Sequence, residues 1–113
     1  MHIKDLCKES HQIAIDKGWF DSRDLESTDT RLAFCALAHS EISEAVECIR
    51  HNDLHMRIDK ESGKPEGAVV EFADAVIRIC DTCEALGLDL EEAIKIKTEY
   101  NAKRPYRHGG KLA

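Results

Sequence analysis

The chain of 113 residues carries 16 basic and 22 acidic side chains, giving a formal net charge of −6, and 42% of it is hydrophobic. This length fits one domain, residues 1–113, and no stretch approaches the roughly 20 apolar residues of a membrane span. The acidic total argues against binding to a nucleic acid polymer, which normally requires a basic face. The first residues lack the apolar segment of a secretory signal, and the five cysteines are odd in number. We therefore expect reduced thiols, no membrane contact and a cytoplasmic location.

The charge is divided unevenly along the chain. Residues 1–94 carry ten basic and 21 acidic side chains, whereas residues 95–113 carry six basic side chains and only Glu99. A basic end that includes a tail at about 103–113 follows an acidic body. Such an end is typical of a solvated tail, but it also suits contact with an anionic ligand.

The helical spacing of apolar residues predicts four helices and no strands, with polar loops at residues 21–29 and 52–64. Pro65 is favourable in the first turn of a helix, and Gly87 is favourable just past a helix end. Asp89 and Glu92 have the spacing of a capping box. The sequence therefore predicts an all-α domain, a four-helix bundle whose helices cover about residues 3–17, 30–50, 65–87 and 89–104.

Carboxylates interrupt the apolar faces of the two central helices. Glu41 falls inside the apolar arc of the helix at 30–50, and Glu44 lies at its edge one turn along. The helix at 65–87 is apolar nearly all round, and most of its charges gather on one narrow strip: Glu71, Asp74, Arg78 and Asp81. A carboxylate on a core-facing stripe is costly unless it is paired or bound to metal.

The two pairs of acids are predicted to meet. If the central helices form an antiparallel hairpin, Glu44 and Glu71 lie roughly 10 and 9 Å from the turn, at about 1.5 Å per residue. Four converging carboxylates need cations, and all-oxygen ligands favour Mg²⁺, Mn²⁺ or Ca²⁺ over zinc. Two alternatives remain open at this point. In the first, Arg78 pairs with Asp74 for purely structural reasons. The second is a di-iron bundle, which is weakened because these helices lack the Glu-x-x-His motifs that it requires.

The spacing of these acids resembles the motif of a known protein family. The pattern Glu41-x-x-Glu44, 26 intervening residues and Glu71-x-x-Asp74 resembles the MazG-like superfamily of all-α nucleoside triphosphate pyrophosphohydrolases. The chain departs from many of its sequences at Ser40, where they have a second Glu. Further similar segments are Lys17-Gly18-Trp19, His39 to Ala45, Gly63 to Gly67, Lys97-x-x-x-Asn101-x-x-Arg104-Pro105, and Tyr106 to Lys111.

The resemblance implies an enzyme that hydrolyses a (d)NTP to its monophosphate and pyrophosphate for nucleotide-pool house-cleaning. The four acids would hold Mg²⁺, with Mn²⁺ as a substitute, and Glu41 or Glu44 would activate the attacking water. The resemblance also implies a homodimer or homotetramer. The apolar helix at 65–87 points the same way, because a lone bundle of this size covers it poorly. The rival interpretation is a non-catalytic helical module that binds nucleotide or protein.

Substrate contacts are predicted outside the acids. Lys97, Asn101 and Arg104 fall at i, i+4 and i+7, on one helix face suited to phosphate and sugar contacts. Trp19 could stack on a base or pack in the core, and the sequence does not distinguish these roles. Cys80-x-x-Cys83 lacks a second pair of ligands at zinc spacing, so we interpret both thiols as packing residues.

Overall fold

The computed structural model describes residues 1–106 and is mostly helical, as expected of an all-α chain. Most of the predicted basic tail, 107–113 with Arg107 and Lys111, lies outside the described residues. The elements in order are α1 (Ile3–Asp16), α2 (Thr28–Arg50), β1 (Arg57–Ile58), β2 (Pro65–Glu66), α3 (Ala68–Ala85) and α4 (Leu90–Ala102).

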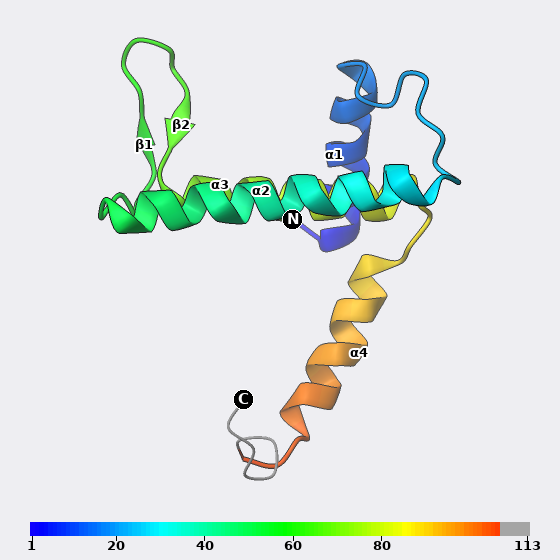
Figure 1. Cartoon of the computed structure of the whole chain (residues 1–113). Coiled ribbons are helices and arrows are strands. Elements are labelled where there is room, and N and C mark those ends of the chain that lie inside the picture. Colours follow the sequence, from blue (N-terminus) through cyan, green and yellow to red (C-terminus); the bar gives the residue numbers. More distant parts are fainter. Residues whose placement is uncertain (107–113) are drawn as a thin grey trace.

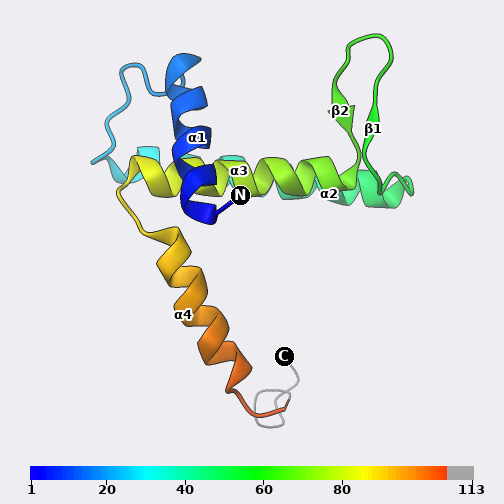
Figure 2. The same ribbon diagram turned by 180° about the vertical axis from the view of Figure 1, so that it is seen from behind.

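The centre of the molecule is a hairpin of α2 and α3, which run side by side in opposite directions (Figures 1 and 2). Small side chains lie buried on both helices, with Ala45 fully buried, Ala68 2% exposed and Ala75 4% exposed. Side chains this short let two helix backbones approach closely. The antiparallel arrangement of these helices is the one expected from the sequence. It sets the acidic turns of the two helices opposite each other.

Helix α1 crosses α3 at a steep angle near the C-terminal half of α3 (Figure 2). Cys7 of α1 and Cys80 of α3 are both buried there, in agreement with the packing role expected for Cys80. Burial and the neighbouring Cys7 thiol raise the pKa of the Cys80 thiol to about 12. The loop after α1 then brings Phe20 against the ring of Phe34 on α2, with ring centroids 5.6 Å apart.

The segment between α2 and α3 contains a two-stranded antiparallel sheet that the sequence did not predict. Pro65 lies in β2 opposite Ile58, so the prediction that it opens the third helix is wrong. The helix begins instead at Ala68, whose N–H donates to the Asp53 carbonyl at 2.9 Å, while the Val69 N–H donates to the Leu54 carbonyl at 3.1 Å. The preceding loop thus satisfies the first amide groups of α3, which have no partners inside the helix.

Helix α4 extends away from the other three helices (Figure 1). None of its residues is buried, and its hydrogen bond to α1 is the one donated by the Lys4 amide to Glu91 at 3.1 Å. Three helices pack together within one chain, and the expected fourth does not complete a bundle with them.

The molecule exposes far more surface than a compact monomer would. Its accessible surface is 8750 Å² for 12.7 kDa, whereas a compact protein of this mass exposes about 6,200 Å². The radius of gyration is 16.8 Å against about 13 Å expected for this length. Many large apolar side chains of the hairpin are close to half exposed, among them Ile42, Val46, Phe72, Val76 and Ile79. Within residues 1–106, no helix has the length and apolarity needed to cross a membrane.

Gly67 is the residue that allows the loop to meet α3 so closely. Its φ of 120° lies in the region that favours glycine, and a Cβ there would overlap the carbonyl oxygen of His55. We expect Gly67→Ala to destabilise the fold by about 2–3 kcal/mol, since backbone strain adds to the overlap. Gly63→Ala is the matched control, with φ of 73° but open space around its Cβ, and it should cost about 1 kcal/mol. Urea unfolding of both variants measures the difference, and equal losses would refute this role of Gly67.

Candidate functional site

Three carboxylates meet in the middle of the α2–α3 hairpin. One oxygen each from Glu41 on α2 and from Glu71 and Asp74 on α3 lie within 4.8 Å of one another. Glu71 and Asp74 are one turn apart in the first two turns of α3, so both project from one face toward α2. Three of the four acids that the sequence predicted to converge therefore lie in one cluster, and their role as metal ligands stays a prediction.

An ion pair ties this acid cluster to the next turn of α3. The Arg78 Nε donates to Glu41 Oε1 at 2.9 Å, and the two side chains are only 35% and 13% exposed. The alternative in which Arg78 pairs with Asp74 along the same helix is not what forms, although the guanidinium still acts to lower the pKa of Asp74. Arg78 thus reaches across the hairpin and offsets part of the negative charge.

Charge crowding remains after this compensation. Burial raises the pKa of Glu71 above its ordinary value, reinforced by hydrogen bonding with Glu41 and by the charges of Asp74, Glu41 and Glu44. Burial followed by the charge of Glu41 raises the pKa of Asp74. Both shifts favour a proton on acids that a nearby cation would keep ionised.

Glu44 lies outside the acid cluster. Its side chain is exposed, and it makes no ion pair or hydrogen bond with residues 1–106. It is close enough for its charge to contribute to the raised pKa of Glu71. Glu44 is therefore a neighbour of the acid cluster whose carboxylate stays free.

The donor set of the acid cluster fits a hard divalent cation. All three groups are carboxylates, and among the described residues no histidine or cysteine joins them. Mg²⁺ and Mn²⁺ prefer oxygen ligands of this kind, and Mg²⁺ commonly keeps several waters beside one or two carboxylates. Glu41, Glu71 and Asp74 are thus suited to hold Mg²⁺ or Mn²⁺, with room for further oxygen ligands.

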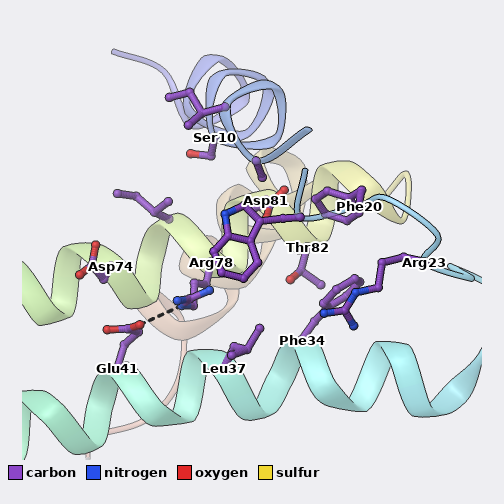
Figure 3. A pocket seen from close by; sticks show the side chains of 14 residues that line it. Ser10, Phe20, Arg23, Phe34, Leu37, Glu41, Asp74, Arg78, Asp81 and Thr82 are labelled. Atoms are coloured by element: carbon purple, nitrogen blue, oxygen red, sulfur yellow. Dashed lines mark hydrogen bonds and ion pairs between the residues drawn. The ribbon is translucent and has the colours of Figure 1, made fainter. Parts of the chain in front are cut away.

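A pocket of about 260 Å³ opens beside the acid cluster, between α1, α2 and α3. Figure 3 shows Glu41 and Asp74 at one end and Phe20, Phe34 and Arg23 at the other. Trp19 also lines this pocket and is 59% exposed, so it is not the core residue that one interpretation allowed. Acidic and aromatic groups therefore share one cavity.

The basic residues predicted for substrate binding lie elsewhere in the chain. Helix α4 ends at Ala102, so Arg104 lies just past the helix that was expected to include it. Lys97 and Arg104 nevertheless place their charged groups 4.7 and 5.7 Å from the centre of the Tyr100 ring. Lys97, Asn101 and Arg104 are all exposed, and none of them lines the pocket. Because α4 extends away from the hairpin, a single chain does not bring them to the acid cluster.

Several residues of the pocket were not predicted as site residues, including Phe20, Arg23, Arg78, Asp81 and Thr82. A signal existed for two of them, because Arg78 and Asp81 belong to the charged strip that also contains Glu71 and Asp74. Asp74, Arg78 and Asp81 of that strip line the pocket. Phe20 and Arg23 come from an irregular loop, for which helical spacing gives no direction.

Comparisons of the chain with models of protein families, with curated proteins and with solved structures find no significant match. The resemblance to MazG-like enzymes therefore stays a prediction, and a function has to be argued from the geometry of the site.

The Arg78–Glu41 ion pair should matter most when no cation is bound. We expect Arg78→Gln to destabilise the metal-free protein by about 1–2 kcal/mol, or roughly 5–10 °C in Tm, because it leaves three acids uncompensated. Added Mg²⁺ should restore more of the Tm of this variant than of the parent protein. Thermal unfolding followed by circular dichroism, with and without Mg²⁺, measures both effects. An equal response of the two proteins to Mg²⁺ would contradict the acid cluster as a cation site.

Proposed function

We propose that the protein is a Mg²⁺-dependent nucleoside triphosphate pyrophosphohydrolase of the MazG-like type, acting in nucleotide-pool house-cleaning in the cytoplasm. The observation that carries the proposal is the convergence of Glu41, Glu71 and Asp74 at one end of a pocket whose other end is aromatic. A nucleotide has the matching polarity, with a charged phosphate chain at one end and a planar base at the other.

The reaction would convert (d)NTP and water to (d)NMP and pyrophosphate. Water forms a bond to the α-phosphorus, and the bond from that phosphorus to the oxygen bridging to the β-phosphorus breaks. Pyrophosphate leaves with the electron pair, and the proton of the attacking water passes to a base. The pocket accordingly has to hold the phosphate chain, align one water and stabilise a highly charged product.

The acid cluster would hold the cation for this reaction. When bound by Glu41, Glu71 and Asp74, Mg²⁺ or Mn²⁺ supplies charge neutralisation at phosphate oxygens and a lowered pKa of water. Glu41 is fixed in place by Arg78, which keeps one of its oxygens oriented within the cluster. Glu44 has no partner among residues 1–106, which leaves its carboxylate available to accept a proton from water.

The aromatic end of the pocket would take the base. Phe20 and Phe34 lie against each other, and the exposed Trp19 belongs to the same wall. Base stacking on aromatic side chains is worth about 1–3 kcal/mol per base and tolerates any base. Substrate contact is thus the role we assign to Trp19.

The exposed surface supports a homodimer or a homotetramer. The excess over a compact monomer is about 2,500 Å² per chain, or about 5,000 Å² for two copies, which is at the upper end of the 2,000–5,000 Å² that obligate homodimers bury in total. Part of the exposed surface is an apolar groove of about 500 Å³ between α2 and α3, lined by residues such as Ile42, Ala75, Ile79 and Leu86. A second copy of the hairpin would cover this groove.

Assembly would also give a role to the basic residues of α4 and of the segment just past its end. Lys97, Asn101 and Arg104 lie away from the pocket of their own chain. Contact of these residues with substrate phosphates and sugar therefore requires the pocket of another copy, toward which an extended α4 could reach. Their positive charge complements the anionic substrate.

One observation favours the rival function, a non-catalytic nucleotide- or protein-binding module. The ion pair between Arg78 and Glu41 satisfies part of the acid cluster without a metal, as a structural arrangement would. A module of this kind would bind nucleotide without releasing pyrophosphate, so turnover separates the two functions.

The enzyme should release pyrophosphate from at least one nucleotide in a panel of dNTPs and NTPs, and only with Mg²⁺ or Mn²⁺. Glu71→Gln should lower kcat/KM by at least about 100-fold, since it removes a carboxylate from the cation site. Glu47→Gln is the matched control on α2, because Glu47 is exposed and pairs with Arg50 at the surface. No turnover of any nucleotide at high enzyme concentration would exclude this function, and near-full activity of Glu71→Gln would exclude this site.

Light scattering coupled to size exclusion should give at least twice the monomer mass of 12.7 kDa. Ile42→Glu should shift the protein toward monomer, because it places a charge in the apolar groove. Ile15→Glu, on the exposed side of α1 and outside both cavities, is the control that should leave the mass unchanged. A parent protein that elutes as a clean monomer would refute the assembly.

A further inference from the structure

A side-chain pair at the crossing of α1 and α3 takes no part in the acid cluster. His11 Nδ1 and Asp81 Oδ1 lie 2.8 Å apart, and the two side chains are 20% and 22% exposed. Asp81 lines the pocket seven residues after Asp74, which is two turns and about 10 Å along α3. It therefore lies on the same helix face as Asp74, toward the other end of the cavity (Figure 3).

The Asp81 carboxylate has acceptor capacity to spare. A carboxylate only accepts, so His11 donates through Nδ1 and fixes one oxygen. No other hydrogen bond or ion pair from residues 1–106 reaches the Asp81 carboxylate. The rings of Phe20 and His11 pack edge to face, with centroids 4.7 Å apart at 82°, and this contact helps hold the imidazole in place. Asp81 is thus a held, partly desolvated acceptor that borders the pocket.

A donor stands at the same end of the cavity. Arg23 lines the pocket with its guanidinium carbon 5.7 Å from the centre of the Phe34 ring. The aromatic end consequently offers flat walls, one anionic acceptor and one cationic donor. This combination suits a planar heterocycle that has both an N–H edge and an acceptor atom.

We propose that the Asp81 carboxylate, positioned by His11, accepts a hydrogen bond from an exocyclic amino group of the nucleobase. This inference rests on the proposed nucleotide site. The pocket would then prefer bases with an exocyclic amino group, namely cytosine, guanine and adenine, over uracil and thymine. An amino group donates to the carboxylate, whereas the ring N–H of uracil and thymine lies between two carbonyl oxygens that the carboxylate repels. Arg23 would add a contact to the acceptor atoms of cytosine or guanine, which adenine matches less well.

Trp19 makes the inference testable without turnover. It is the sole tryptophan of the chain and it lines the pocket, so its fluorescence should change when a base enters. Titration with dCMP, dGMP, dAMP, dUMP and dTMP, with free tryptophanamide as the optical control, gives a Kd for each. The amino-bearing bases should bind at least about tenfold more tightly than dUMP and dTMP, the scale of one charge-assisted hydrogen bond.

Substitutions assign the preference to Asp81. Asp81→Asn should reduce the ratio of the dUMP and dCMP Kd values to below about threefold, because an amide both donates and accepts. Glu84→Gln, one turn further along α3 and outside this pocket, should leave the ratio unchanged. His11→Gln, which keeps a donor, should retain more of the preference than His11→Leu.

Three results would overturn the inference: equal Kd values for dCMP and dUMP, an unchanged ratio in folded Asp81→Asn, or no fluorescence change with any nucleotide. The parent ratio alone decides the matter if Asp81→Asn fails to fold. A base preference in binding without hydrolysis of any triphosphate would refute the proposed enzyme and leave this inference standing. Hydrolysis of the triphosphates of all bases with equal kcat/KM, together with equal Kd values, would support the proposed enzyme and refute this inference.

Discussion

The mutual repulsion of Glu41, Glu71 and Asp74 is the constraint on which the rest of the structure depends. Small side chains such as Ala45 and Ala75 hold α2 and α3 close together, so the acids cannot move apart without loss of packing. Arg78 supplies one positive charge. The raised pKa values of Glu71 and Asp74 show that part of the negative charge stays uncompensated. The fold thus holds three mutually repelling carboxylates at one end of the pocket, and a divalent cation would offset this repulsion.

The same hairpin that carries the acids also carries an unsatisfied apolar surface. One side of it meets α1 and forms the pocket, while the other side is a groove of about 500 Å³ with half-exposed aliphatic side chains. Helix α4 buries none of its residues and leaves the body of the chain. Catalysis and assembly would therefore share one structural element, so a change in how two hairpins pack would alter the spacing of the acids directly.

The sequence predicted the features that depend on helical periodicity. The spacing of Glu41, Glu71 and Asp74 was enough to foresee their convergence, since a helix face and an antiparallel hairpin fix their positions. It failed where tertiary hydrogen bonds decide the conformation: Pro65 reads as a helix start, yet it pairs in a strand and the helix opens after Gly67. The position of α4 could not be foreseen either, because none of its residues is buried and no core packing therefore fixes its direction.

The way α3 begins has a consequence for where this protein can vary. Because carbonyls of Asp53 and Leu54 anchor the helix start, the register of α3 against α2 is set at the base of the small sheet and not at its tip. Residues 60–63 at the tip line neither cavity and contribute no acid to the cluster. Loop tips of this kind tolerate insertions. The tip is therefore an attachment point where extra segments, a label or a tether could be added without displacing the acid cluster.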